Sequence, residues 1–358
     1  YDVERHLVAP GQYRVHGLVH DDIQLRYELS IQSPGTPPWK TADRTGMWLA
    51  DHTPPCDVLS LPDGSPHGEA AQVLVTAPTG EAGYSAMWLT LDGEKLYSTK
   101  MRGWRSPKTL TADPGGEPND RYYAFGVLQG RLYGLRRDAD VIEGPDAYDE
   151  IANIKAPENR RERDWNWMRM TQVQDCAAWN GRVLVSYPLA DRIVVLDTRK
   201  SGKAAQVGEI ELADPRGLDF DARGRLFAVT GNTLVRFDSP DVAGLDLGAA
   251  RTVVDDLEDP NRVMVGPEGR LYVSDTGDSH QVKVYTADGR DVRTIGKPGG
   301  PVTGHYDEQR MSHPSGMAVD AEGKLWVAEM EYMPKRISVW NAATGKFIRA
   351  YYGPPKYG

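Results

Sequence analysis

The amino-acid sequence predicts an all-β fold, a β-propeller of four-stranded blades, most simply with six blades. The chain has 37 Gly and 25 Pro among 358 residues, which indicates many tight turns between short strands. A unit that runs from a Pro to a Gly turn also recurs along the chain. Units of roughly 45–50 residues with four strands each are typical of propeller blades.

The three clearest units are Asp214–Thr230, Asp259–Asp275 and His313–Glu329. Each begins with a Pro, which fits the start of a strand, and continues through alternating apolar residues to a Gly turn and a Leu-aromatic pair. A fourth segment, Gln174–Tyr187, matches when its turn is shortened by two residues. Each unit is followed by another hairpin, as in Ile337–Arg349, so four strands per blade are expected.

The earlier units are weaker. Pro55–Gly64 keeps the Pro-to-Gly spacing, Ala86–Tyr97 matches an outer hairpin, and Tyr122–Gly134 reads as a degenerate blade. We therefore predict a propeller over residues 51–358. Its blades are expected to begin near residues 54, 107, 170, 213, 258 and 312.

Residues 1–50 are expected to form N-terminal strands and a connector. Ala9–Leu18 and Ile23–Ser30 read as strands, and Ser33–Arg44 has the Pro, Gly and Thr content of a linker. The chain starts at Tyr1 and stops within a turn-like stretch. We interpret it as a piece of a longer polypeptide.

Composition excludes several classes of function. Asp and Glu exceed Lys and Arg by 51 to 42, a net charge of -9, which argues against nucleic-acid binding. No apolar stretch is long enough to span a membrane. The two cysteines, Cys56 and Cys176, stand outside any metal or redox motif and are expected to be buried thiols. No phosphate-binding loop, zinc-protease motif or nucleophile elbow occurs.

The repeat pattern resembles the NHL-repeat β-propellers over roughly residues 170–350. The segment Tyr332–Trp340 resembles uncharacterised, very large secreted bacterial proteins that join propellers to Ig-like modules. Ala9–Leu18 is similar to the closing strand of such an Ig-like module; the alternative is that it extends or covers the first blade. The resemblance implies a secreted or cell-surface location in a bacterium, with other domains of the parent chain as partners.

In a propeller, the start of each innermost strand and the end of the second strand emerge on one face beside the central channel. The alignment places five candidate ligand-binding residues there: Asp175, Arg216, Asn261, Arg262 and Ser315. The most informative is Arg262, because it stands where the two other full-length units have Gly217 and Gly316. A long cation at a position that prefers no side chain suggests a functional role.

The same face carries candidates for metal binding and catalysis. Asp259, Asp275 and Glu329 could hold Ca²⁺ or another divalent cation through oxygen ligands, although no cofactor is certain. His313, Tyr187 or Glu329 could act in proton transfer. Related NHL-type lyases need several His for zinc, and only His313 stands at the matching place. For Asp275 we favour a structural role, in which it binds local backbone groups.

Trp165 and Trp167 lie in an Arg-rich loop between the second and third expected blades. They could form a stacking platform for sugar rings, while the alternative is a solvated connector whose Trp side chains pack on the rim. Both interpretations stay open on the sequence alone.

These observations favour a binding or scaffold module of a larger secreted bacterial protein. It would bind carbohydrate or protein in its central funnel. One alternative is a metal-assisted lyase or hydrolase that acts on a polar, sugar-derived substrate at the same face. Another is a subunit that associates with itself through strand edges.

Overall fold

The computed structural model of the chain describes its residues in fifteen stretches, and the statements below concern these. They are residues 2–9, 12–19, 23–27, 56–61, 65, 73–76, 86–99, 108–113, 121–128, 130–138, 148–157, 173–200, 202–301, 307–330 and 336–352.

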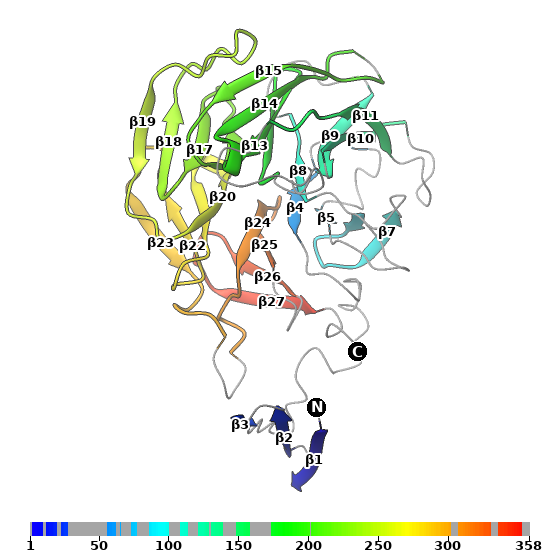
Figure 1. Ribbon diagram of the computed structural model, residues 1–358, viewed down its shortest axis with the longest axis vertical. Helices are drawn as coiled ribbons and strands as arrows, with labels where there is room; N and C mark the ends of the chain where they lie inside the picture. The colour runs from blue at the N-terminus through cyan, green and yellow to red at the C-terminus, as the bar shows by residue number, and fades with distance from the viewer. Residues whose placement is uncertain are drawn as a thin grey trace.

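The predicted fold class is confirmed: the chain forms six antiparallel sheets of four strands each, arranged as the blades of a β-propeller (Figure 1). Within every blade the strands follow one another in chain order from the axis outward. The innermost strands are β4 (Asp57–Ser60), β8 (Thr109–Thr111), β12 (Cys176–Trp179), β16 (Pro215–Phe220), β20 (Pro260–Val265) and β24 (Pro314–Val319).

The other three strands of each blade complete the sheets, and two short 3₁₀ helices, η4 (Pro188–Ala190) and η5 (Pro267–Gly269), lie in the connections. The second strands are β5 (Val73–Thr76), β9 (Tyr122–Leu128), β13 (Arg182–Tyr187), β17 (Leu226–Thr230), β21 (Leu271–Asp275) and β25 (Lys324–Glu329). The third are β6 (Ala86–Leu89), β10 (Arg131–Arg136), β14 (Arg192–Asp197), β18 (Thr233–Phe237), β22 (Gln281–Tyr285) and β26 (Arg336–Asn341). The outermost are β7 (Lys95–Thr99), β11 (Tyr148–Asn153), β15 (Ala205–Glu211), β19 (Ala250–Val254), β23 (Asp291–Ile295) and β27 (Phe347–Tyr352).

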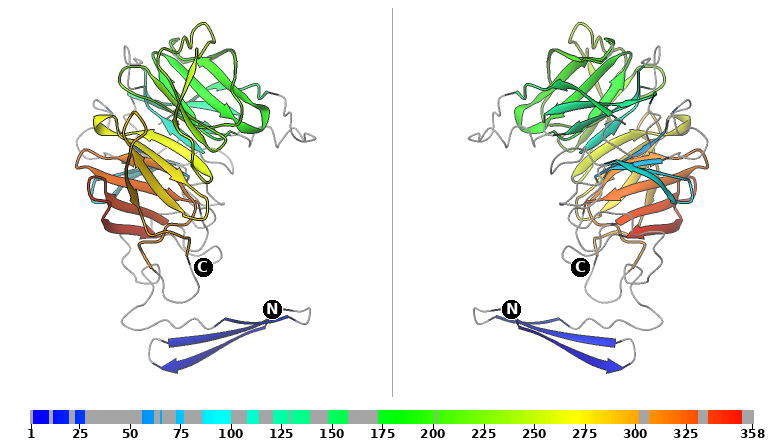
Figure 2. Two further views of the ribbon diagram at one scale, coloured as in Figure 1. Left: turned by 90° about the vertical axis from the view of Figure 1, so that its left-hand side faces the viewer. Right: turned by 90° about the vertical axis from the view of Figure 1, so that its right-hand side faces the viewer.

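A separate antiparallel sheet precedes the propeller. It consists of β1 (Asp2–Ala9), β2 (Gln12–Val19) and β3 (Ile23–Tyr27), and these strands pair with one another (Figure 2). In the part of the chain that the structure describes, no helix is long and apolar enough to cross a membrane.

The recurring Asp and Gly of the repeat unit build the turn between the first two strands of a blade. In blade four, Asp221 Oδ1 accepts hydrogen bonds from the backbone N–H groups of Arg223 and Arg225, at 3.0 and 2.9 Å. Gly224 follows with φ of +78°, a conformation that side chains with a Cβ rarely adopt. Asp320 repeats this arrangement in blade six. The motif therefore specifies the turns rather than a reactive group.

Alternation along each strand produces the core between blades. On β13, Val183, Val185 and Tyr187 pack with the residues of blade two, whereas Leu184 belongs to the cluster shared with blade four. Both faces of such a strand are buried because a neighbouring blade covers each one. The apolar core is therefore a series of seams between successive blades.

The ring closes directly between the first and last blades. The inner strands β24 and β4 are in contact, and the backbone N–H of Gly316 donates to the carbonyl of Cys56 at 3.3 Å. Farther out, the ring of Tyr351 stacks on Trp326, and its hydroxyl donates to the carbonyl of Asp92 at 2.6 Å. Closure therefore needs no exchange of a terminal strand.

Candidate ligand-binding channel

Three carboxylates join neighbouring blades along the axis: Asp57 and Asp219 on the inner strands β4 and β16, and Asp175 directly before β12. In each of them, Oδ1 accepts a hydrogen bond from the backbone N–H of the next residue in the chain. Oδ2 accepts a hydrogen bond from a backbone N–H of the following blade. The contacts between blades are Asp57 to Leu110 N at 2.7 Å, Asp175 to Leu218 N at 2.9 Å and Asp219 to Val265 N at 2.6 Å. A carboxylate has about four acceptor sites, so these bonds leave some of its capacity unused.

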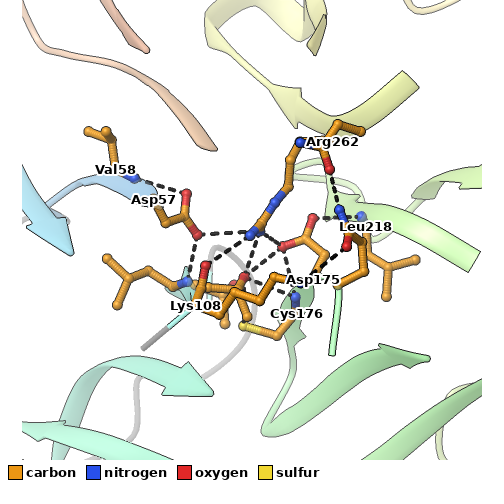
Figure 3. A network of polar contacts seen from close by, with 12 residues as sticks. Asp57, Val58, Lys108, Asp175, Cys176, Leu218 and Arg262 are labelled. Atoms are coloured by element: carbon orange, nitrogen blue, oxygen red, sulfur yellow. Dashed lines mark hydrogen bonds and ion pairs between the residues drawn. The ribbon is translucent and has the colours of Figure 1, made fainter. Parts of the chain in front are cut away.

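The guanidinium of Arg262 lies at the centre of the channel (Figure 3). Its Nη1 atom donates to Asp175 and to Thr109 Oγ1, the latter at 2.7 Å, and pairs with Asp57 at 3.4 Å. Its Nη2 atom donates to the carbonyl of Lys108 at 3.0 Å. One side chain from blade five thus links blades one, two and three.

The position of Arg262 explains why it replaces a glycine. At the equivalent Gly316, an added Cβ would lie 2.0 Å from Oδ1 of Asp57, so the close approach of blades six and one admits no side chain there. In blade five, the side chain of Arg262 instead points into the axis, where only 5% of it is exposed. The two acidic partners balance its charge in this buried position.

Burial perturbs the acids of this network. Burial, opposed by Arg262, raises the pKa of Asp57 to about 6. Burial likewise raises the pKa of Asp175. The pKa of Lys108 falls to about 8 because of burial and the neighbouring charge of Arg262. The channel therefore contains groups that titrate near neutral pH.

A cavity of about 310 Å³ begins at this network and extends along the axis toward the ends of the inner strands. Residues from all six blades line it, and Ser60, Asp113 and Val319 near its outer end are partly exposed. Its walls combine acidic and apolar groups. They include Asp57, Asp113, Asp175, Asp219, Arg262, Phe220, Met264, Met317 and Val319.

Asp219 lines the cavity from the inner strand β16 and remains partly exposed, so its carboxyl can meet a ligand there. Burial raises its pKa to about 7, and the negative charges of Asp175 and Asp57 add to the rise. The hydrogen bonds from two backbone N–H groups act in the opposite direction and lower the pKa. It can therefore accept hydrogen bonds when ionised and donate one when protonated.

The predicted residues Asp175, Asn261 and Arg262 do come together, in two layers. Asn261 lies on the strand-start side of Arg262, where it accepts a hydrogen bond from Gln174. Lys108 Nζ donates to the same Gln174 at 3.3 Å. These groups cover the end of the channel that the sequence predicted to be its open mouth. The cavity lies on the other side of Arg262.

Arg216 and Asp259 lie at the rim of the strand-start face. Arg216 Nη1 pairs with Asp259 at 2.5 Å and donates to the carbonyl of Pro260 at 3.1 Å. Asp259 also accepts a hydrogen bond from Thr276 Oγ1 at 2.9 Å. Both residues are therefore engaged with each other rather than with the axial cavity.

Asp275 and Glu329 each lie beside a cation of their own blade. Asp275 pairs with Lys283 at 2.8 Å and accepts three backbone N–H groups; although burial opposes the change, these contacts lower its pKa. Glu329 accepts the N–H of Ser312 at 2.9 Å and pairs with Arg336 at 3.4 Å. Among the described residues, no group of three or more His, Cys, Asp or Glu could hold a metal ion.

The remaining candidates are dispersed. His313 is exposed on the rim, where its backbone N–H donates to Nδ1 of His280 at 3.0 Å. Tyr187 lies in the core between blades two and three, because alternation on β13 turns it to the same face as Val185. Ser315 is buried beside the strand-start end. Trp165 and Trp167 lie outside the described residues. The catalytic and metal roles named for these residues stay predictions.

Sequence reasoning missed Asp57, Asp219 and Lys108. Asp57 follows Pro55 by two positions, just as Arg262 follows Pro260, so the alignment held a signal for it. Asp219 interrupts an otherwise apolar pair, Leu218 and Phe220, on an inner strand. Lys108 precedes a degenerate blade, and no repeat signal marks it.

No protein-family model matches the chain. Among curated proteins, the outer membrane usher protein CS3-2 of Escherichia coli is 24% identical over 213 residues, which are 56% of this chain and 21% of the usher. The match therefore spans about a fifth of the usher's length.

Among solved structures, a chain of the nidogen/laminin complex superposes with a TM-score of 0.52 at 12% identity, covering 83% of this chain and 93% of that chain. A functionally unknown protein from Desulfotomaculum acetoxidans DSM 771 gives a TM-score of 0.50 at 14% identity, covering 84% and 89%. At such identities the likeness shows the fold alone. Fold and geometry together define a six-bladed β-propeller with a cavity on its axis.

Proposed function

We propose that this chain is a non-catalytic binding module, an NHL-type β-propeller of a larger secreted bacterial protein, and that a sugar unit occupies its axial cavity. The observation that carries the proposal is the cavity of about 310 Å³ that ends on the Arg262 network, with Asp219 partly exposed in its wall. Ligand sites are concave and mostly apolar, with a few well-placed polar groups.

The size and lining of the cavity favour a sugar unit. Its volume lies at the small end of the usual range for ligand pockets, about 300–1,000 Å³, so it suits one ring rather than a large ligand. Sugar hydroxyls can bind Asp219 in either protonation state, because a hydroxyl both donates and accepts. Met264 and Met317 offer apolar surface to the C–H face of a ring.

The buried thiols support binding rather than covalent catalysis. Burial raises the pKa of Cys56 to about 11 and also raises the pKa of Cys176. Both side chains are therefore protonated at neutral pH, whereas the thiolate is the nucleophilic form. Arg262, which could stabilise an anion, is already bound to Asp57 and Asp175.

The location of the parent protein rests on two likenesses. The sequence pattern resembles the propellers of large secreted bacterial proteins, and the curated match is an outer membrane protein of a bacterium. A module at the cell surface would meet glycans of the envelope or of the surroundings. A carbohydrate ligand fits such a place.

Calorimetric titration of the purified chain with a panel of methyl hexosides, hexosamines and uronic acids tests the proposal. We expect saturable binding of at least one sugar, and Asp219→Asn should weaken it by about tenfold, the loss of a charge-assisted hydrogen bond. Asp291→Asn serves as the matched control, because Asp291 is exposed on the outermost strand of blade five.

Saturable binding that survives Asp219→Asn unchanged would place the sugar elsewhere. Absence of binding across the whole panel would overturn the proposal. Turnover of a bound sugar, followed by product analysis, would replace a binding module by an enzyme.

A further inference from the structure

A second hollow adjoins the axial cavity between blades four and five. It has a volume of about 860 Å³ and shares four lining residues with the cavity, namely Phe220, Val265, Gly266 and Pro267. The two spaces therefore meet at the ends of β16 and β20. We call this second space the blade-four groove.

The walls of the blade-four groove show its direction. One wall is the turn between β16 and β17, residues 221–225, and the other is the turn between β20 and β21, residues 266–269. Farther out it reaches Arg236 on β18 and the turn after β22, at Ala287 and Asp288. It thus runs outward from the axis, from the first strand of each blade to the third.

Two of the three arginines that line the groove form ion pairs with Asp side chains. Arg225 is paired with Asp221 at 2.6 Å, and Arg236 is paired with Asp238 at 2.7 Å. Arg223 is exposed, and among the described residues no ion pair involves its side chain. On the opposite wall, Glu268 is exposed in the turn of η5. Among the described residues, the turn of blade four therefore presents to the groove one guanidinium, that of Arg223, which has no ion pair.

The inner end of the cavity restricts how a ligand could enter. Arg262, Asp57 and Asp175 fill the axis there, each with a side chain no more than 6% exposed. A polymer cannot thread past this network, so only a terminal unit can occupy the cavity. The units that follow must leave by the open end, where the blade-four groove begins.

We propose that the ligand is a linear acidic oligosaccharide bound end-on, with its terminal sugar in the axial cavity and a uronic acid carboxylate of the next unit at Arg223 in the blade-four groove. The inference rests on the proposed sugar binding and adds to it the length and the charge of the ligand. Planar guanidinium and carboxylate groups match each other geometrically, which favours an arginine for this contact.

Titration with a matched set of sugars tests the inference. The set comprises the methyl glycoside of the terminal sugar, a disaccharide whose second unit is a uronic acid, and the uncharged methyl ester of that disaccharide. We expect the acid disaccharide to bind about tenfold tighter than its ester, the size of one charge-assisted contact. Arg223→Ala should remove this difference, and Arg223→Lys should restore part of it.

Lys200→Glu is the control for net charge, since Lys200 is exposed on blade three and lies outside both spaces. It should leave the preference for the acid intact, whereas Arg223→Glu should reverse it. Equal affinity for the glycoside, the ester and the acid would overturn end-on acidic recognition and leave sugar binding standing. Failure of all three to bind would overturn the proposed function as well.

Discussion

Arg262 is the residue on which the geometry of the axis depends. It brings one buried positive charge to two buried carboxylates from other blades, Asp57 and Asp175. A buried ion pair of this kind adds modest net stability, but loss of one partner leaves an uncompensated charge in a dry site. Arg262 therefore makes the ring sensitive to a single substitution at its centre.

Replacing this cation should destabilise the fold. Arg262→Met is expected to lower the free energy of unfolding at pH 7 by about 3–5 kcal/mol, the usual cost of leaving buried charges unpaired. At pH 5 the loss should shrink, because Asp57, whose pKa is about 6, is then mostly protonated. Urea unfolding at both pH values measures the effect.

Arg199→Met is the comparison, since the Arg199 side chain is 62% exposed and should contribute no more than about 0.5 kcal/mol. If Arg262→Met proves no more costly than Arg199→Met at pH 7, the axial network does not hold the blades together.

Asp219 makes a prediction about the dependence of stability on pH. Its folded pKa of about 7 exceeds the unfolded value of about 3.9, so the folded state binds this proton more tightly. The contribution of Asp219 to stability is therefore present below pH 4 and declines as pH rises to about 7. Asp219→Asn should flatten the fall in urea midpoint between pH 4.5 and pH 7.5. An unchanged slope would show that the carboxyl titrates normally.

At the level of residues, the sequence predicted Arg262 because a cation replaced a repeated glycine. It did not predict Asp219, since one carboxylate between two apolar residues looks like the ordinary outward face of a strand. It misplaced Tyr187, because strand alternation rather than chain position decides whether a residue at a strand end faces the axis or the core.

Among the elements, the seam between β27 and blade one decides whether the ring stays closed. Tyr351 stacks on Trp326 with ring centroids 5.6 Å apart, and its hydroxyl donates to the carbonyl of Asp92. Val58, Val75 and other apolar residues of blade one complete this cluster. Side-chain packing therefore does here what strand exchange does in other rings.

Removing the aromatic side chain of Tyr351 from the contact between β27 and blade one should open the ring locally. Tyr351→Ala is expected to cost about 3 kcal/mol or more, as for other large aromatic side chains removed from a core. Amide exchange should accelerate in β4 and β24 before it does in β16. Ile348→Ala on the same strand is the control, because Ile348 is 38% exposed. Uniform acceleration across all blades would indicate global destabilisation instead of a specific seam.

The strands and turns of a blade could be predicted more fully where its sequence follows the repeat more closely. Blades four, five and six follow the Pro-to-Gly pattern, and the sequence showed both their strands and their turns. Blade two was hard to recognise, because its inner strand β8 has only three residues and therefore carries little of the repeat pattern. The direct closure of the ring depends on contacts such as that of Tyr351 with Asp92, 259 positions apart, which a local pattern cannot show.

At the scale of the molecule, the two faces of the propeller differ. On the strand-start face, Lys108, Gln174 and Asn261 cover the axis and ion pairs occupy the rim. On the other face, the cavity and the blade-four groove are open. The candidate site that the sequence placed on the first face therefore moves, in our proposal, to the second.

A crystal structure of the chain soaked with the tightest-binding oligosaccharide tests this account most directly. We predict density for one sugar ring in the axial cavity against Asp219, with the next unit beside Arg223. Density on the strand-start face instead, between Asp259 and His313, would contradict the proposed site even if the six blades were found as described.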